Sequence, residues 1–178
     1  MNLSRGHLLF LTVFLAFLLN FGCTTPKVWT SKPVIQTTGN PSFSAKIETL
    51  KMDNPFYVCF RLLVVNKTGE NLEIDWNMTR YLYKGRSHGG FVFKGIDPED
   101  IKNKTIPEDI ITGKGTFEKV IFPTKLLARA PLRPKSQGGG ETAISPGIFP
   151  TGENGIMLVV KKGNKEIVEK MTLKIEEK

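Results

Sequence analysis

One pentapeptide in this chain has the residue types of a hydrolytic site. Residues Gly85-Arg86-Ser87-His88-Gly89 match the pattern G-x-S-x-G. In the nucleophile elbow, for which this pattern is typical, the serine lies on a strained strand-to-helix turn, and an acid and a histidine follow later in the chain. Here the pentapeptide joins two predicted strands, and no histidine follows His88. Because His88 is adjacent to Ser87 in sequence, it cannot easily act as its base. We therefore expect a hairpin turn and no enzyme activity, with a cryptic enzyme as the alternative.

A second group of chemically capable residues lies in the acidic stretch DPEDIKNKTIPEDI, residues 97–110. Its five carboxylates belong to Asp97, Glu99, Asp100, Glu108 and Asp109. Ca²⁺ takes about six to eight oxygen ligands, so such a loop is a candidate calcium site. The stretch lacks the D-x-[DN]-x-[DN]-G spacing of a calcium loop and contains two lysines. The sequence therefore predicts no metal and no cofactor, with a calcium-stabilised domain as the alternative.

The chain has two cysteines, Cys23 and Cys59. Cys59 lies in the apolar run FYVCFRLLVV, where a small buried hydrophobic residue is its expected role. A reactive thiolate would need a neighbouring histidine or a helix terminus, and the sequence indicates neither. Cys23 has a different setting, because it ends the apolar segment near the start of the chain.

The first residues have the pattern of an export signal. Residues 1–7 contain Arg5 and no acid, and the segment from Leu8 to Leu19 is apolar except for Thr12. The apolar run is shorter than the roughly 20 residues that a membrane-spanning helix needs. The run ends in Gly22-Cys23, followed by Thr-Thr-Pro.

This ending resembles the lipobox of bacterial lipoproteins, although Asn20 and Phe21 depart from its usual residues. The resemblance implies cleavage before Cys23, attachment of lipid to Cys23 and a membrane anchor. With Thr24 after the cysteine, it also implies sorting to the outer membrane. A cleaved signal without lipid and an uncleaved signal anchor are the alternatives.

The expected domain organisation has three parts. Residues 1–22 are the lipoprotein signal peptide, and residues 23–42, rich in Thr, Ser and Pro, are a flexible tether. Residues 43–178 form one folded domain, long enough for a real core. The formal net charge is +8. For an exported protein this favours anionic lipid or an acidic envelope polymer as a partner, and no nucleic acid.

From Phe43 onward apolar and polar residues alternate with a period of two, as in half-buried strands. The alternating runs cover residues 43–48, 56–65, 72–83, 91–93, 117–127, 156–162 and 165–175. Within the third run Leu72, Ile74, Trp76 and Met78 are expected to point inward, and a bulge or a crossing between sheets is expected at Arg80. Gly163-Asn164 is the expected two-residue loop of a hairpin.

These runs predict an all-β fold, an Ig-like antiparallel β-sandwich of about seven strands. Cys59 and Trp76 resemble the cysteine and tryptophan of the immunoglobulin fold, without its second cysteine. The chain also resembles small uncharacterised bacterial lipoproteins with Ig-like domains, through the lipobox, VVNKTGENLEIDWNMTRYLYKG and SPGIFPTGENGIMLVVKKGNKE. That resemblance implies a fold and a location but no active site.

Two long predicted loops, residues 97–115 and 131–152, are the candidate contact regions, because loops of more than about 12–15 residues are often functional. The basic residues that flank the second loop, and that are expected to meet an acidic partner, are Lys125, Arg129, Arg133 and Lys135. The sequence thus predicts a non-enzymatic, lipid-anchored envelope lipoprotein whose sandwich contacts an envelope protein. An exported small-ligand-binding domain is a further alternative.

Overall fold

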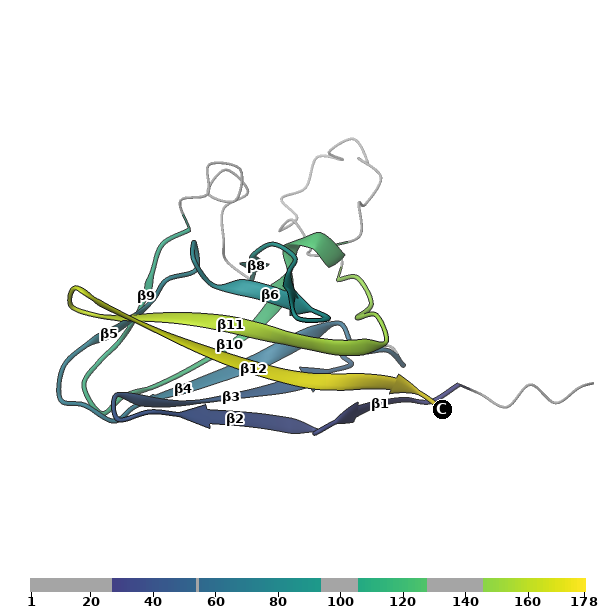
Figure 1. Cartoon of the computed structure of the whole chain (residues 1–178), viewed down its shortest axis with the longest axis horizontal. Helices are drawn as coiled ribbons and strands as arrows, with labels where there is room; N and C mark the ends of the chain where they lie inside the picture. The colour runs from purple at the N-terminus through teal and green to yellow at the C-terminus, as the bar shows by residue number, and fades with distance from the viewer. Residues whose placement is uncertain (1–26, 54, 94–105, 128–145) are drawn as a thin grey trace, which may run out of the picture.

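The computed structural model describes residues 27–53, 55–93, 106–127 and 146–178, which form an antiparallel β-sandwich (Figure 1). The described strands are β1 (Trp29–Lys32), β2 (Ile35–Gly39), β3 (Phe43–Leu50), β4 (Cys59–Asn66), β5 (Leu72–Ile74), β6 (Arg80–Tyr83), β7 (Arg86–Ser87), β8 (Phe91–Val92), β9 (Asp109–Ile111), β10 (Thr116–Pro123), β11 (Gly152–Lys162) and β12 (Lys165–Glu177), with a 3-10 turn η1 (Thr124–Leu126) after β10. The all-β sandwich expected from the sequence is confirmed. The predicted signal peptide lies outside the described residues.

The strands form two sheets. In the first sheet the order is β1-β12-β11-β5-β9, and β6 also pairs with β11 and with β7. In the second sheet the order is β2-β3-β4-β10-β8. Strands β11 and β12 are the longest and pair along the whole of β11. Their hairpin turns at Gly163-Asn164, where Gly163 has a φ of 56°, so this predicted hairpin is confirmed.

Alternating side chains of the two sheets meet in one core, as in other face-to-face sandwiches. Phe60 of β4 lies near its centre: its ring centroid is 4.6 Å from that of Phe149, 6.3 Å from Phe91 and 6.5 Å from Tyr81. The predicted strands at 43–48 and 56–65 correspond to β3 and β4. Their inward residues Phe43, Ala45, Ile47, Phe60, Leu62 and Val64 are all buried.

The structure corrects the predicted tether of residues 23–42. Trp29 to Lys32 pair with β12 in the first sheet, and Ile35 to Gly39 pair with β3 in the second. The chain changes sheets around the cis Lys32–Pro33 bond. An unpaired edge strand exposes its backbone N–H and C=O groups. Residues 29–32 pair with the edge of β12 and residues 35–39 with the edge of β3, so these residues have backbone partners that their composition does not indicate. The folded domain therefore begins near Trp29.

The structure also corrects the predicted strand of residues 72–78. Strand β5 ends at Ile74, and a turn closed by the bond from Thr79 N to Asp75 O separates it from β6. As a result Met78 is 47% exposed, whereas Asp75, expected on the outer face, is buried. The break at Arg80 is thus a complete turn instead of a bulge, and both β5 and β6 pair with the same strand, β11.

The twelve described strands exceed the expected seven because β1 and β2 lie in the predicted tether, β7 and β9 lie in predicted connections, and one predicted run is divided into β5 and β6. The run at 117–127 ends as a strand at Pro123, where η1 begins. The predicted loop at 97–115 contains the short strand β9, which pairs with β5. Residues 94–105 and 128–145 lie outside the described residues.

We predict that Thr79→Val lowers the free energy of unfolding by about 1–3 kcal/mol. Thr79 is buried, and its Oγ1 accepts a hydrogen bond of 3.1 Å from Val159 N in β11. Valine keeps the shape but leaves that N–H unpaired in the interior. Denaturant unfolding measures the change, and Thr37→Val, at an exposed position of β2, is the matched control. Equal stability of the two variants would contradict the assigned role.

Candidate interaction surface

The structure places one of the five site residues predicted from sequence. Lys125 is exposed in η1, and the neighbouring Thr124 N donates to Gly90 O. Cys23, Arg129, Arg133 and Lys135 lie outside the described residues. Lys125 therefore lies beside the connection between β7 and β8.

Ser87, the serine of the G-x-S-x-G pentapeptide, is the last residue of β7 before that connection. Ser87 is exposed at the end of β7 and pairs with Leu82 of β6 across a tight hairpin. Lys84 and Gly85 turn the hairpin with φ angles of 49° and 74°. The pentapeptide thus lies in a strand-to-strand hairpin, as the sequence predicts, and not on a strand-to-helix turn.

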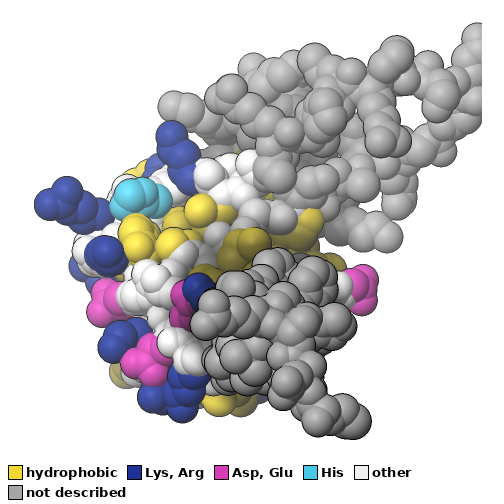
Figure 2. Space-filling view, turned by 90° about the vertical axis from the view of Figure 1, so that its right-hand side faces the viewer, with side chains coloured by type: hydrophobic (Ala, Val, Ile, Leu, Met, Phe, Trp, Pro, Cys, Tyr) yellow, Lys and Arg dark blue, Asp and Glu magenta, His cyan; other side chains and the backbone are white. Residues whose placement is uncertain are grey.

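One end of the sandwich gathers side chains that are far apart in sequence. We call it the aromatic end and define it by Trp29, Phe56, Tyr57, Tyr83 and Ile148. Trp29 packs edge-on against Phe56 with ring centroids 5.2 Å apart. The backbone N–H of Phe149, next to Ile148, donates to Tyr57 O, and the Tyr83 hydroxyl donates to Thr151 O. Figure 2 views this side and shows apolar surface gathered between lysine and arginine side chains.

Two buried polar groups hold the segment that brings Ile148 to this end. Asn154 is fully buried at the start of β11, and its Oδ1 accepts a hydrogen bond from the Tyr81 hydroxyl. Its Nδ2 donates to Pro150 O at 2.8 Å and to Gly152 O at 3.0 Å. Burial raises the pKa of Tyr81, so this hydroxyl stays a donor throughout the physiological range. The residues before β11 are therefore tied to β6.

Two lysine ammonium groups lie over tyrosine rings of the aromatic end. Lys51 Nζ lies 5.0 Å from the centroid of the Tyr57 ring, and Lys84 Nζ lies 5.2 Å from that of Tyr83. Both distances are within the range of cation–π attraction. Asp53, in the connection between β3 and β4, and Glu153, at the start of β11, are exposed acids nearby. The surface thus combines apolar side chains with the half-buried Lys51 and the exposed Lys84.

This surface as a whole is not apparent from the sequence. The sequence places Trp29 in the predicted tether, with docking onto the domain or a position at the membrane interface as alternatives. It places Phe56 and Tyr57 in a predicted strand and Tyr83 just before a predicted turn. The one signal that could have found it is that each of these aromatic residues lies within a few residues of a predicted connection. Which connections share an end depends on the sheet topology.

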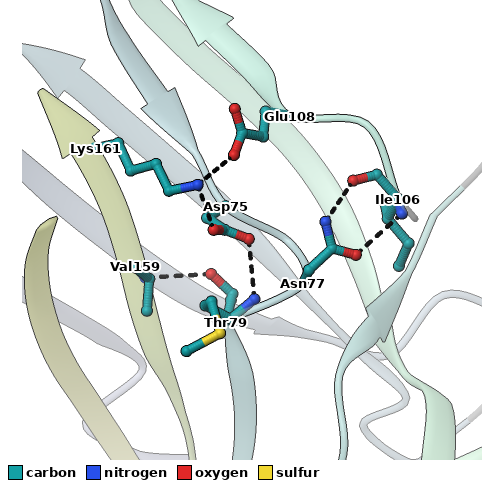
Figure 3. Close-up of polar contacts among 8 residues, drawn as sticks. Asp75, Asn77, Thr79, Ile106, Glu108, Val159 and Lys161 are labelled. Atoms are coloured by element: carbon teal, nitrogen blue, oxygen red, sulfur yellow. Dashed lines mark hydrogen bonds and ion pairs between the residues drawn. The ribbon is translucent and has the colours of Figure 1, made fainter. Parts of the chain in front are cut away.

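Glu108 and Asp109, the described members of the predicted acidic loop, are both paired with lysines. Lys161 Nζ lies 2.6 Å from Glu108 and 2.7 Å from the buried Asp75 (Figure 3). The hydrogen bond to Asp75 and that to Glu108 raise the pKa of Lys161. Asn77 exchanges hydrogen bonds of 2.8 and 3.0 Å with the backbone of Ile106 beside them. These contacts hold the start of β9 onto the turn between β5 and β6.

Asp109 belongs to a second lysine site. Its Oδ2 accepts hydrogen bonds from Trp76 Nε1 at 2.7 Å and from Lys119 Nζ at 2.5 Å. Lys119 Nζ also lies 3.9 Å from the centroid of the Phe93 ring. Within the described ranges no group of three or more His, Cys, Asp or Glu side chains could hold a metal ion. The described carboxylates of the acidic stretch therefore serve internal ion pairs.

Cys59 is buried and free, as the sequence predicts. It packs in a small cluster with Val58, Val92 and Phe122, apart from the main core that contains Trp76. Cys59 and Trp76, which resemble the cysteine and tryptophan of the immunoglobulin fold, therefore belong to separate clusters. Desolvation raises the pKa of the Cys59 thiol to about 11, against a smaller opposite effect of Arg61.

We predict that Cys59 does not react with maleimide at neutral pH in the folded protein. A buried thiol of which the pKa is about 11 is almost entirely protonated, and the thiolate is the reactive form. Peptide mass mapping after labelling reports the modification. Labelling in guanidinium chloride is the positive control, and modification of Cys59 without denaturant would contradict the prediction.

We predict that Glu176→Gln lowers Tm at neutral pH and that the difference disappears in acid. Hydrogen bonds from Lys32 of β1 and Lys174 lower the pKa of Glu176 from its usual 4.5 to about 2. Because the folded pKa is depressed, this stabilisation is present above about pH 4.5 and is lost as the pH falls toward 2. Thermal unfolding across this range measures it.

Glu166→Gln, at an exposed position of the same strand, is the matched control. A Tm difference between Glu176→Gln and wild type that persists at pH 2 would show that packing, and not charge, holds β1 at this point.

No helix in the described part of the chain has the length and hydropathy of a membrane span. Comparison of the chain with known protein families, with curated proteins and with solved structures found no match.

Proposed function

We propose that this protein is an exported lipoprotein of the cell envelope, anchored by lipid on Cys23. The observation that carries the proposal is the short apolar segment after Arg5 that ends in Gly22-Cys23. The other cysteine supports it, because Cys59 is buried and free. A thiol packed in the interior is not a site for acylation, which leaves Cys23 as the cysteine available for lipid.

The β-sandwich is, in this proposal, a non-enzymatic module that meets an envelope protein. The former candidate for catalysis, Ser87, lies in a hairpin strand, and the acids Glu108 and Asp109 are engaged with lysines. The β-sandwich carries apolar side chains, tyrosines and lysines on the connections between its strands, and these side chains are available for contact with a partner. The residue after the lipidated cysteine is Thr24, which favours the outer membrane as the location.

We predict that labelled palmitate enters the wild-type chain and that Cys23→Ser abolishes the label. The serine variant is also expected to keep the length of the uncleaved precursor, because cleavage of a lipobox requires the modified cysteine. Expression of the full chain in a bacterium with labelled palmitate, followed by electrophoresis, measures both. Cys59→Ala is the matched control and is expected to retain label and cleavage.

An unlabelled, shortened wild-type chain would contradict the lipid anchor. The protein would then be a freely exported β domain. Label that persists in Cys23→Ser would place the lipid elsewhere in the chain.

A further inference from the structure

The spacing between Cys23 and β1 limits how far the sandwich can stand from a membrane anchor. Five residues, 24–28, separate Cys23 from Trp29, the first residue of β1. A fully extended chain spans at most about 3.3–3.6 Å per residue, so Trp29 lies within roughly 20 Å of the anchored cysteine. A tether that continued to residue 42 would have allowed about three times that reach. The anchored end of the sandwich is therefore held close to the bilayer.

The end held there is the aromatic end. Strand β1 begins at Trp29, which packs on Phe56, and Val28 exchanges backbone hydrogen bonds with Lys178 beside it. Three exposed apolar side chains belong to the segments at this end: Val28 is 51% exposed, Met52 57% and Ile148 48%. In Figure 2 apolar atoms are visible on this side of the molecule, interspersed with backbone and polar atoms.

The composition of the aromatic end fits the interfacial layer of a membrane. Tryptophan and tyrosine are enriched at that depth, because each combines an apolar ring with a polar group. Lysines on the rim can rest their chains on apolar surface while the ammonium group meets a lipid phosphate. Lys51 and Lys84 lie on Tyr57 and Tyr83 in this way.

The charge of the aromatic end favours an anionic lipid surface as its binding partner. A lysine near an anionic membrane surface contributes about 1 kcal/mol of attraction. Lys51, Lys84 and Lys125 are all on connections around this end, against the exposed acids Asp53 and Glu153. Lys27 is already paired with Glu177 at 2.5 Å. The surface is thus weakly basic around an apolar centre.

We propose that the aromatic end rests directly on an anionic phospholipid surface, with Met52 and Ile148 in the head-group layer. This inference depends on the lipid anchor of the proposed function. Lys125, expected from the sequence to meet an acidic protein, would meet lipid phosphates instead. The opposite end of the sandwich, with the β11–β12 hairpin, then faces away from the membrane and is the end open to a protein partner.

Single-cysteine labelling tests the orientation, because Cys59 is buried and Cys23 is acylated. Met52→Cys and Ile148→Cys place a polarity-sensitive NBD dye at the aromatic end. Ile110→Cys in β9 and Val168→Cys in β12, with 62% and 50% exposure in the parent residues, are matched controls away from it. The acylated full-length variants are reconstituted into vesicles with about a third phosphatidylglycerol in phosphatidylcholine.

We expect blue-shifted NBD emission at positions 52 and 148 and water-like emission at 110 and 168. Flotation of the same samples shows whether the protein is on the vesicles, and palmitate labelling shows whether it is acylated. Protein that is acylated and floats, with water-like emission at all four positions, overturns this inference and leaves the proposed function standing. Protein that neither takes palmitate nor floats overturns both.

Charge reversal tests the lipid chemistry separately. Lys51→Glu with Lys84→Glu is expected to lose most of the blue shift at position 148, because the rim would then repel phosphatidylglycerol. Lys165→Glu with Lys170→Glu changes the net charge equally at exposed positions of β12 and is expected to keep the shift. Equal loss in both double variants would overturn the proposed contact of Lys51 and Lys84 with lipid.

Discussion

The rest of the fold depends on the backbone pairing of β11. One side of this strand is paired with β12 along its whole length, and the other side is shared by β6 and β5 in turn. Between those two partners the polar groups of Val159 would lie unpaired inside the protein, and each unpaired group would cost about 1–3 kcal/mol. The turn between β5 and β6 removes that cost, since Asp75 N donates to Val159 O and Thr79 Oγ1 accepts from Val159 N. Trp76 is buried in the main core immediately after Asp75.

Two buried asparagines also bind main-chain groups in this way. Asn66 lies at the end of β4, and Asn154 lies near the start of β11. Asn66 Nδ2 donates to the backbone oxygens of Glu70, Ile111 and Thr112, and so joins the connections around β4, β5 and β9. Asn154 does the same for the residues before β11 and binds the Tyr81 hydroxyl. An amide can satisfy several main-chain groups at once, so irregular connections can pack without unpaired polar atoms. The positions of the connections, and hence the surfaces at each end, are well defined by these contacts.

The position of β1 determines what those surfaces can be used for. Because Trp29 to Lys32 are paired with β12, any force on the N-terminal segment acts on an edge strand of the first sheet, held there by four backbone pairs and by ion pairs of Lys27 and Lys32. An anchor at Cys23 would therefore orient the whole sandwich and not merely localise it. The aromatic end is the surface that such an orientation turns toward the bilayer. This connects the packing of one short strand to the proposed place of the protein in the envelope.

The sequence by itself determined the elements in which polarity alternates regularly: β3, β4, and the β11–β12 hairpin at Gly163-Asn164. It also determined that Cys59 is buried and that Ser87 lies in a hairpin, because local residue patterns decide both. It could not determine that residues 29–39 are strands, since their partners are supplied by β12 and β3, more than a hundred residues away in the first case. Nor could it bring Trp29, Phe56, Tyr83 and Ile148 to one end, or bury Asp75. Those outcomes follow from which strands become neighbours, and long-range hydrogen bonding decides that, which no local pattern records.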